Sequence, residues 1–172
     1  MRKVIGVLSA QLVVVLATAG FTRAGAGDNQ RFFAAGRLEA PSITLVASGV
    51  ITGAGSLTAE SADYRPADKT YRETDLAVIG GGTLTISVNG RFDVWPFALD
   101  PRTCTQQGVL GGTWTVSGSA ADFAGTTGRG TLSGRFFTYA RRGPDGCDET
   151  AIKGFVAGPM VGSLHLGKDG SH

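Results

Sequence analysis

Two histidines are the first side chains to consider, because histidine is the commonest general base and metal ligand near neutral pH. His165 alternates with Leu164 and Leu166, so its side chain points away from both leucines. A general base is one interpretation, but no Gly-x-Ser-x-Gly nucleophile motif accompanies it. We therefore favour a solvent-facing His165. Together with His172 it falls short of the three ligands that a metal needs, so we expect no metal site and no cofactor.

One arginine and four aromatic residues are the candidate ligand-binding residues. Arg135 lies between Gly134 and Phe136, where its guanidinium could bind a ligand carboxylate at the mouth of a barrel. The interpretation that we favour is an outward arginine whose aliphatic stem covers apolar surface. The aromatic residues could line a ligand cavity, although such residues in a small barrel more often pack into the core. The candidate set is Phe92, Trp95, Phe97, Trp114 and Arg135.

Apolar residues alternate with polar residues along most of the chain, which indicates strands rather than helices. Leu84, Ile86 and Val88 share one face of a segment whose other face carries threonine and serine. Gly-rich and Pro-containing turns separate such segments, and glycine is abundant, with 27 residues among 172. The predicted strands cover residues 43–52, 74–79, 83–92, 108–118, 130–139, 152–157 and 161–166.

This pattern predicts an all-β fold, a single antiparallel β-barrel of about eight strands. Glycines within the strands, such as Gly134 and Gly154, indicate tight coiling and bulges and favour a barrel over a sandwich. The polar stretch 59–73 is interpreted as a surface loop or an irregular hairpin whose charges are solvated.

The first residues have the composition of a secretory signal peptide. Arg2 and Lys3 precede an apolar run, and small residues follow at Ala17 and Ala19, so we assign residues 1–19 to the signal, with cleavage as late as residue 26. Residues 20–40 are expected to be a flexible segment and residues 41–168 the barrel domain. Removal of the signal leaves 14 basic against 14 acidic side chains, which predicts no nucleic-acid binding. The expected location is secreted or periplasmic, without membrane insertion after cleavage.

Cys104 and Cys147 are the two cysteines of the chain. An exported protein meets oxidising conditions, in which an even pair of cysteines usually forms a disulfide. A metal or redox pair would need more ligands or a Cys-x-x-Cys spacing. We therefore predict a structural Cys104–Cys147 disulfide.

The segment 111–136 has a strand, a turn of small residues with Phe123, Gly125 and Gly128, and a second strand. This arrangement resembles the allene oxide cyclase and dirigent protein superfamily. The order of the motifs SGVITGAG at 48–55, GGTLT at 81–85 and DPRTC at 100–104 is similar to that of small exported bacterial proteins with an allene oxide cyclase-like barrel. The resemblance covers residues 43–166 and implies a calycin-like barrel. In the plant cyclases the cavity is largely apolar, and dirigent proteins use acidic cavity residues.

Two functions remain open at this stage. The first is a non-catalytic barrel that is packed solid or binds a small apolar ligand. The second is a cofactor-independent cyclase or isomerase of the allene oxide cyclase type, which would constrain a flexible substrate. Glu73, Asp75 and Asp93 are the carboxylates of the strand regions, but fold analogy alone assigns them no role. The oligomeric state stays open.

Overall fold

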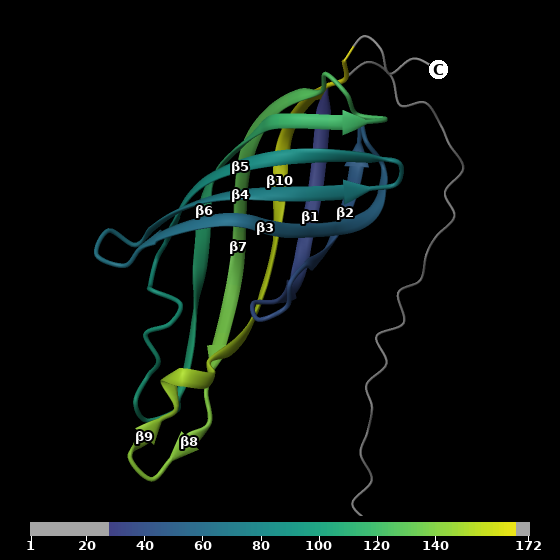
Figure 1. Ribbon diagram of the computed structural model, residues 1–172. Helices are drawn as coiled ribbons and strands as arrows, with labels where there is room; N and C mark the ends of the chain where they lie inside the picture. The colour runs from purple at the N-terminus through teal and green to yellow at the C-terminus, as the bar shows by residue number, and fades with distance from the viewer. Residues whose placement is uncertain (1–27, 168–172) are drawn as a thin grey trace, which may run out of the picture.

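The computed structural model describes residues 28–167 (Figure 1). The predicted signal peptide and both of its cleavage sites lie outside these residues. Within the described range, no helix has the length and apolar character needed to cross a membrane.

Within residues 28–167, eight antiparallel strands form a closed barrel, in the order β1-β10-β7-β6-β5-β4-β3-β2. In Figure 1, β3, β4 and β5 cross in front of β1, β2 and β10 at a steep angle. The strands are β1 (Asn29–Arg37), β2 (Ile43–Gly49), β3 (Gly53–Arg65), β4 (Thr70–Ile79), β5 (Gly82–Phe92), β6 (Thr105–Ala121), β7 (Thr127–Tyr139) and β10 (Lys153–His165). A short hairpin of β8 (Arg142–Gly143) and β9 (Gly146–Cys147) and the 3-10 helix η1 (Glu149–Ala151) lie between β7 and β10. The all-β barrel predicted from the sequence is confirmed.

The barrel starts earlier than the sequence pattern predicts. Residues 29–37, expected to be flexible, form β1, which pairs with both β2 and β10 and so closes the barrel. Gln30, Phe32 and Ala34 alternate toward the interior, and their outward neighbours include Arg31 and Phe33. An outward phenylalanine and a buried glutamine obscure the polar and apolar alternation of this segment. Pairing on both edges holds it as a strand.

The polar stretch 59–73 is also more regular than expected. It forms the end of β3, a four-residue turn and the start of β4, and the two strands pair from Gly55↔Ile79 to Arg65↔Thr70. Its charges are therefore not all on a solvated loop, because inward positions of β4 face the barrel interior.

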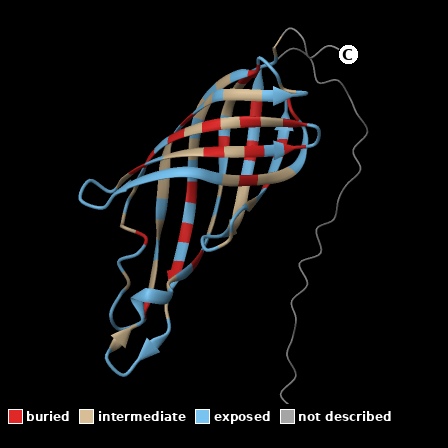
Figure 2. Ribbon diagram, in the orientation of Figure 1, coloured by how far each residue is buried: buried red, intermediate tan, exposed pale blue. Residues whose placement is uncertain are grey.

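One half of the barrel interior is filled by its own side chains. Figure 2 shows buried positions alternating with exposed positions along the strands. Trp114, 1% exposed, meets Phe32 edge to face, with 5.7 Å between ring centroids. Its indole nitrogen donates to the carbonyl of Thr131 at 3.2 Å. A Cβ at Gly130 would lie 2.7 Å from the Trp114 ring, so glycine is needed there.

The buried side chain of Gln30 closes this filled end. Its amide oxygen accepts from the backbone nitrogen of Ile51 at 2.8 Å, and its amide nitrogen donates to the Ile51 carbonyl at 3.1 Å. Both polar groups of a buried glutamine are thereby satisfied. At the same end Phe123, in the turn between β6 and β7, packs against the core.

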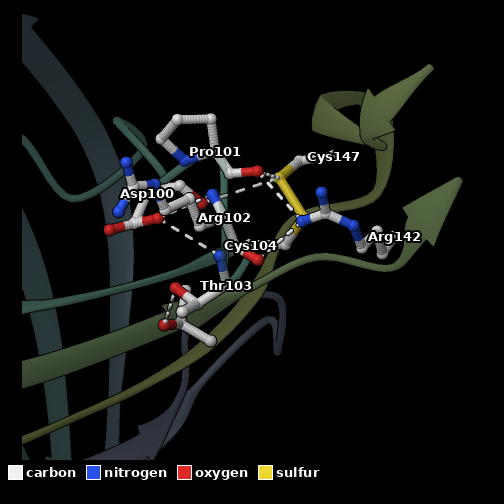
Figure 3. The surroundings of a disulfide bond; sticks show 8 residues. Asp100, Pro101, Arg102, Thr103, Cys104, Arg142 and Cys147 are labelled. Atoms are coloured by element: carbon white, nitrogen blue, oxygen red, sulfur yellow. Dashed lines mark hydrogen bonds between the residues drawn. A yellow bond between two sulfur atoms is a disulfide. The ribbon is translucent and has the colours of Figure 1, made fainter.

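The opposite end carries the turns after β1 and β3 and the long connections after β5 and β7. The β5–β6 connection, residues 93–104, covers this end and is called the roof below. The predicted disulfide between Cys104 and Cys147 is present and joins the roof to the β8–β9 hairpin (Figure 3). The Arg142 guanidinium donates to the carbonyls of Pro101 and Arg102 across the same junction. The roof is thus held from outside the barrel.

The disulfide should contribute strongly to stability. Replacing both cysteines in a Cys104→Ala/Cys147→Ala variant opens a loop with a sequence separation of 43 residues. We expect the free energy of unfolding to fall by about 4 kcal/mol, because the unfolded chain regains the entropy that the cross-link removes. Urea denaturation of the variant and the parent, with alkylation and mass measurement to verify that the parent is oxidised, tests this. A loss below about 1 kcal/mol would contradict a stabilising role.

Candidate functional site

A cavity of about 160 Å³ occupies the roofed end of the barrel. Its lining is mostly aromatic and aliphatic, with side chains from the strands and from the roof. It also includes the side chains of Tyr64, Tyr71, Glu73 and Asp75, which come from β3 and β4. A cavity of roughly 150 Å³ accommodates benzene in a protein core, so this one has the size of a single ring.

A β-bulge in β3 places Tyr64 in this site. Ala59 pairs with Asp75 and Ser61 pairs with Thr74, so Glu60 has no partner on β4. The extra residue reverses which side chains face inward, and Tyr64 comes to share the inner face with its partner Tyr71. Without the bulge, the side chain of Tyr64 would point outward. Its hydroxyl donates a hydrogen bond to the Glu73 carboxyl.

Tyr71 stands against a glycine on the neighbouring strand. Its partner on β5 is Gly90, and a Cβ there would collide with the phenol ring. The ring of Tyr71 then lies 4.7 Å, centroid to centroid, from Phe92 and 6.4 Å from Tyr64. Phe92 also meets Phe136 edge to face at 5.7 Å. The missing side chain at Gly90 thus leaves room for one wall of the cavity.

Gly90→Ala should therefore be costly. We expect it to destabilise the fold by about 1–3 kcal/mol, because the new methyl group overlaps the Tyr71 ring. Gly111→Ala is the matched control, since a Cβ there meets nothing closer than 3.8 Å. Urea denaturation measures both, and equal effects of the two substitutions would contradict the packing described.

Two carboxyl groups face the cavity from the same side of β4. Tyr71, Glu73 and Asp75 are alternate residues, so all three side chains point inward. Asp75 is 5% exposed, and burial raises its pKa to about 7, with a further increase from the negative charge of Glu73. Burial also raises the pKa of Glu73, and the hydrogen bond from Tyr64 opposes that change. Of the described residues, no lysine, arginine or histidine lines the cavity to compensate these charges.

The raised pKa of Asp75 predicts a stability that falls as the pH rises. Below pH 4 the carboxyl is protonated in the folded and the unfolded chain, and its contribution is fully present. Between about pH 4 and 7 the unfolded chain ionises while the folded chain keeps its proton, which lowers the free energy of unfolding by up to about 4 kcal/mol.

Urea denaturation across this pH range tests the effect in Asp75→Asn, which should lack this part of the pH dependence. Asp63→Asn, an exposed carboxyl facing outward on β3, is the control and should follow the parent protein. Parallel curves for the parent and Asp75→Asn would show that Asp75 titrates normally in the folded state.

The predicted ligand-binding residues separate into three groups. Phe92 and Phe97 line the cavity, and Trp95 packs against both rings, at 5.7 Å from each, without lining it. Trp114 belongs to the filled half of the barrel. Arg135 is exposed on the outer face of β7 and lines an outer groove, so the structure does not bring it together with the four aromatic candidates. Its binding to a carboxylate ligand stays a prediction.

Two further residues that the sequence analysis considered for a function, His165 and Asp93, lie on the surface. His165 is exposed and lies 3.3 Å from the Asp28 carboxylate, outside the barrel. The Asp93 carboxylate accepts from the backbone nitrogens of Val94 and Val109 and so fixes the start of the roof. Within residues 28–167, no group of three or more histidine, cysteine or acidic side chains is arranged to hold a metal.

Tyr64 and Tyr71 were not predicted as site residues from the sequence, and Glu73 and Asp75 were named only as strand carboxylates without a role. The alternation of Tyr71, Glu73, Asp75, Ala77 and Ile79 was the available signal, but two acidic residues on the inner face made the segment resemble a solvated one. The inward position of Tyr64 depends on the bulge, which the local sequence does not indicate.

Comparison with protein-family models, with curated proteins and with solved structures gives no match for this chain. The described structure itself therefore defines the class. It is a closed, eight-stranded antiparallel barrel with one filled half and a small, aromatic and acidic cavity in the other.

Proposed function

We propose that the protein binds one small molecule of about the size of a single ring in the roofed end of the barrel. The observation that carries this proposal is the cavity of about 160 Å³ with an apolar and aromatic lining and a few convergent polar groups. Ligand sites have this composition, because apolar walls supply binding energy and polar groups fix orientation. The lining residues Tyr64, 42% exposed, and Phe97, 40% exposed, reach the surface, and we place the entrance for the ligand beside them.

The same cavity favours a binding protein over a cyclase or isomerase acting on a long chain. Pockets that enclose larger ligands measure roughly 300–1,000 Å³, and this cavity is smaller. A cofactor-independent isomerisation of a one-ring substrate stays an alternative proposal, for which the support is the protonatable Asp75 inside the cavity.

We also propose that this is an exported barrel related to the allene oxide cyclase-like proteins. Support for export comes from the signal-like composition of residues 1–19 and from the disulfide, since disulfides persist in oxidising compartments. Support for the relationship comes from the turn between β6 and β7, where Phe123 packs at the end of the barrel.

Calorimetric titration with toluene tests the binding proposal. We expect saturable binding by the parent protein and loss of binding in Ala34→Leu, because the inward-facing Ala34 lines the cavity and a larger side chain fills it. Ala35→Leu places the same side chain on the outer face of β1 and should bind as the parent does. Equal binding of toluene by both variants would contradict the proposal, and so would a parent protein that binds none of toluene, benzyl alcohol and benzylamine.

A further inference from the structure

Asp75 is a buried acid with no partner in the described structure. Its side chain lines the cavity, and within residues 28–167 it forms no hydrogen bond and no ion pair. Its carboxyl oxygens are not sealed from water, because among the described residues only Thr126 Oγ1 is a fully buried side-chain atom without a partner; they are open to the cavity, where a ligand can reach them. Glu73, beside it on the inner face of β4, has only the Tyr64 hydroxyl as a partner. Two carboxyls thus face one small space without a neutralising cation.

Aromatic rings surround the same space. Tyr64, Tyr71, Phe92 and Phe136 form a continuous set of ring contacts with centroid distances from 4.7 to 6.4 Å, and each of these residues lines the cavity. The faces of such rings attract cations, most strongly where water is excluded. Carboxylates and ring faces therefore favour the same kind of guest.

We propose that the ligand of this cavity is a small organic ammonium ion with an aromatic or short aliphatic body, its nitrogen bound by Asp75 and Glu73 and its body held among the aromatic rings. This inference rests on the proposed binding function and names the chemical class of its ligand. The ammonium group supplies the donors that Asp75 lacks and the positive charge that the two carboxyls lack.

A bare metal ion fits the same cavity poorly. Calcium takes six to eight oxygen ligands and magnesium an octahedral set, whereas the carboxyls of Glu73 and Asp75 lie in a mostly apolar lining. An apolar body with one cationic end fits both parts of the lining, since the cavity has the size of one ring.

Binding of an ammonium ion should depend on pH. The titratable groups facing Asp75 are Glu73 and Tyr71 on β4 and Tyr64 on β3; the lining residues of the other elements carry no titratable side chain. Near pH 7 the Asp75 carboxyl is protonated in a large fraction of the ligand-free molecules, and an ammonium ligand favours the ionised carboxylate. Affinity should therefore increase from pH 6 to 8, and binding near pH 7 should release protons.

Benzylamine, benzyl alcohol and toluene form the matched set of probes for calorimetric titration of the purified protein at pH 8. We expect benzylamine to bind at least tenfold more tightly than benzyl alcohol. In Asp75→Asn this preference should fall below about threefold, whereas the outward-facing control Asp63→Asn should retain it. Titration of the parent protein at pH 7 in two buffers of different ionisation enthalpy should show proton release with benzylamine and none with toluene, a readout that requires no variant.

The outcomes separate the two proposals. Binding of toluene and benzyl alcohol with no preference for benzylamine, and no proton release, would overturn the ammonium assignment while leaving the small-molecule binding function intact. Failure of all three probes to bind would overturn both. If Asp75→Asn does not fold, two other measurements decide the question. Glu73→Gln should also weaken the preference for benzylamine, and the parent protein should release protons when it binds benzylamine.

Discussion

The burial of Asp75 without a counter-charge is the constraint on which the rest of this site depends. A carboxyl that is 5% exposed and has no hydrogen-bonding partner in the described structure is costly to ionise. The fold keeps it because the pairing of β4 with β3 and β5 fixes every second side chain of β4 toward the interior. Near neutral pH this carboxyl is partly protonated. A ligand with a hydrogen-bond donor can supply the partner that the protein does not provide.

The barrel can hold this group because its two ends differ in packing. At one end Trp114 and Phe32 fill the interior and Gln30 closes it with hydrogen bonds to Ile51. At the other end a bulge and a glycine determine which side chains line the cavity. The bulge at Glu60 brings Tyr64 inward, and Gly90 leaves room for the Tyr71 ring. The aromatic part of the cavity lining therefore depends on two local backbone features, in a barrel whose other half is filled by its own side chains.

The roof links the disulfide to the cavity. Thr138, fully buried on β7, donates its hydroxyl hydrogen to the carbonyl of Pro96, and so ties the middle of the roof to the barrel wall. Cys104 ties its end to the β8–β9 hairpin, which explains how the aromatic residues of a twelve-residue connection can hold one position. The cross-link thereby anchors one end of the segment that carries the cavity-lining Pro96 and Phe97.

Much of the fold could be predicted from the sequence, because alternation and turn residues encode strands locally. Leu84, Ile86 and Val88 indicate β5 without further information. The disulfide could be predicted because the chain has two cysteines and its first residues predict export. The site was harder to predict from the sequence. Phe92 and Phe97 were candidates by residue type, but the inward direction of Tyr64 arises from a one-residue bulge that only the pairing of two strands reveals. Buried acids on an inner strand face resemble solvated ones in sequence, so Glu73 and Asp75 needed the closed barrel to be recognised.

The most direct test of this account is the titration of the Asp75 carboxyl, followed through its side-chain carbon by NMR in the protein without ligand. We expect a midpoint near 7, caused by burial and by the neighbouring charge of Glu73. A midpoint near 4, the value of a solvated aspartate, would show that Asp75 is hydrated or paired in solution. It would contradict the uncompensated acidic cavity on which the ammonium proposal rests.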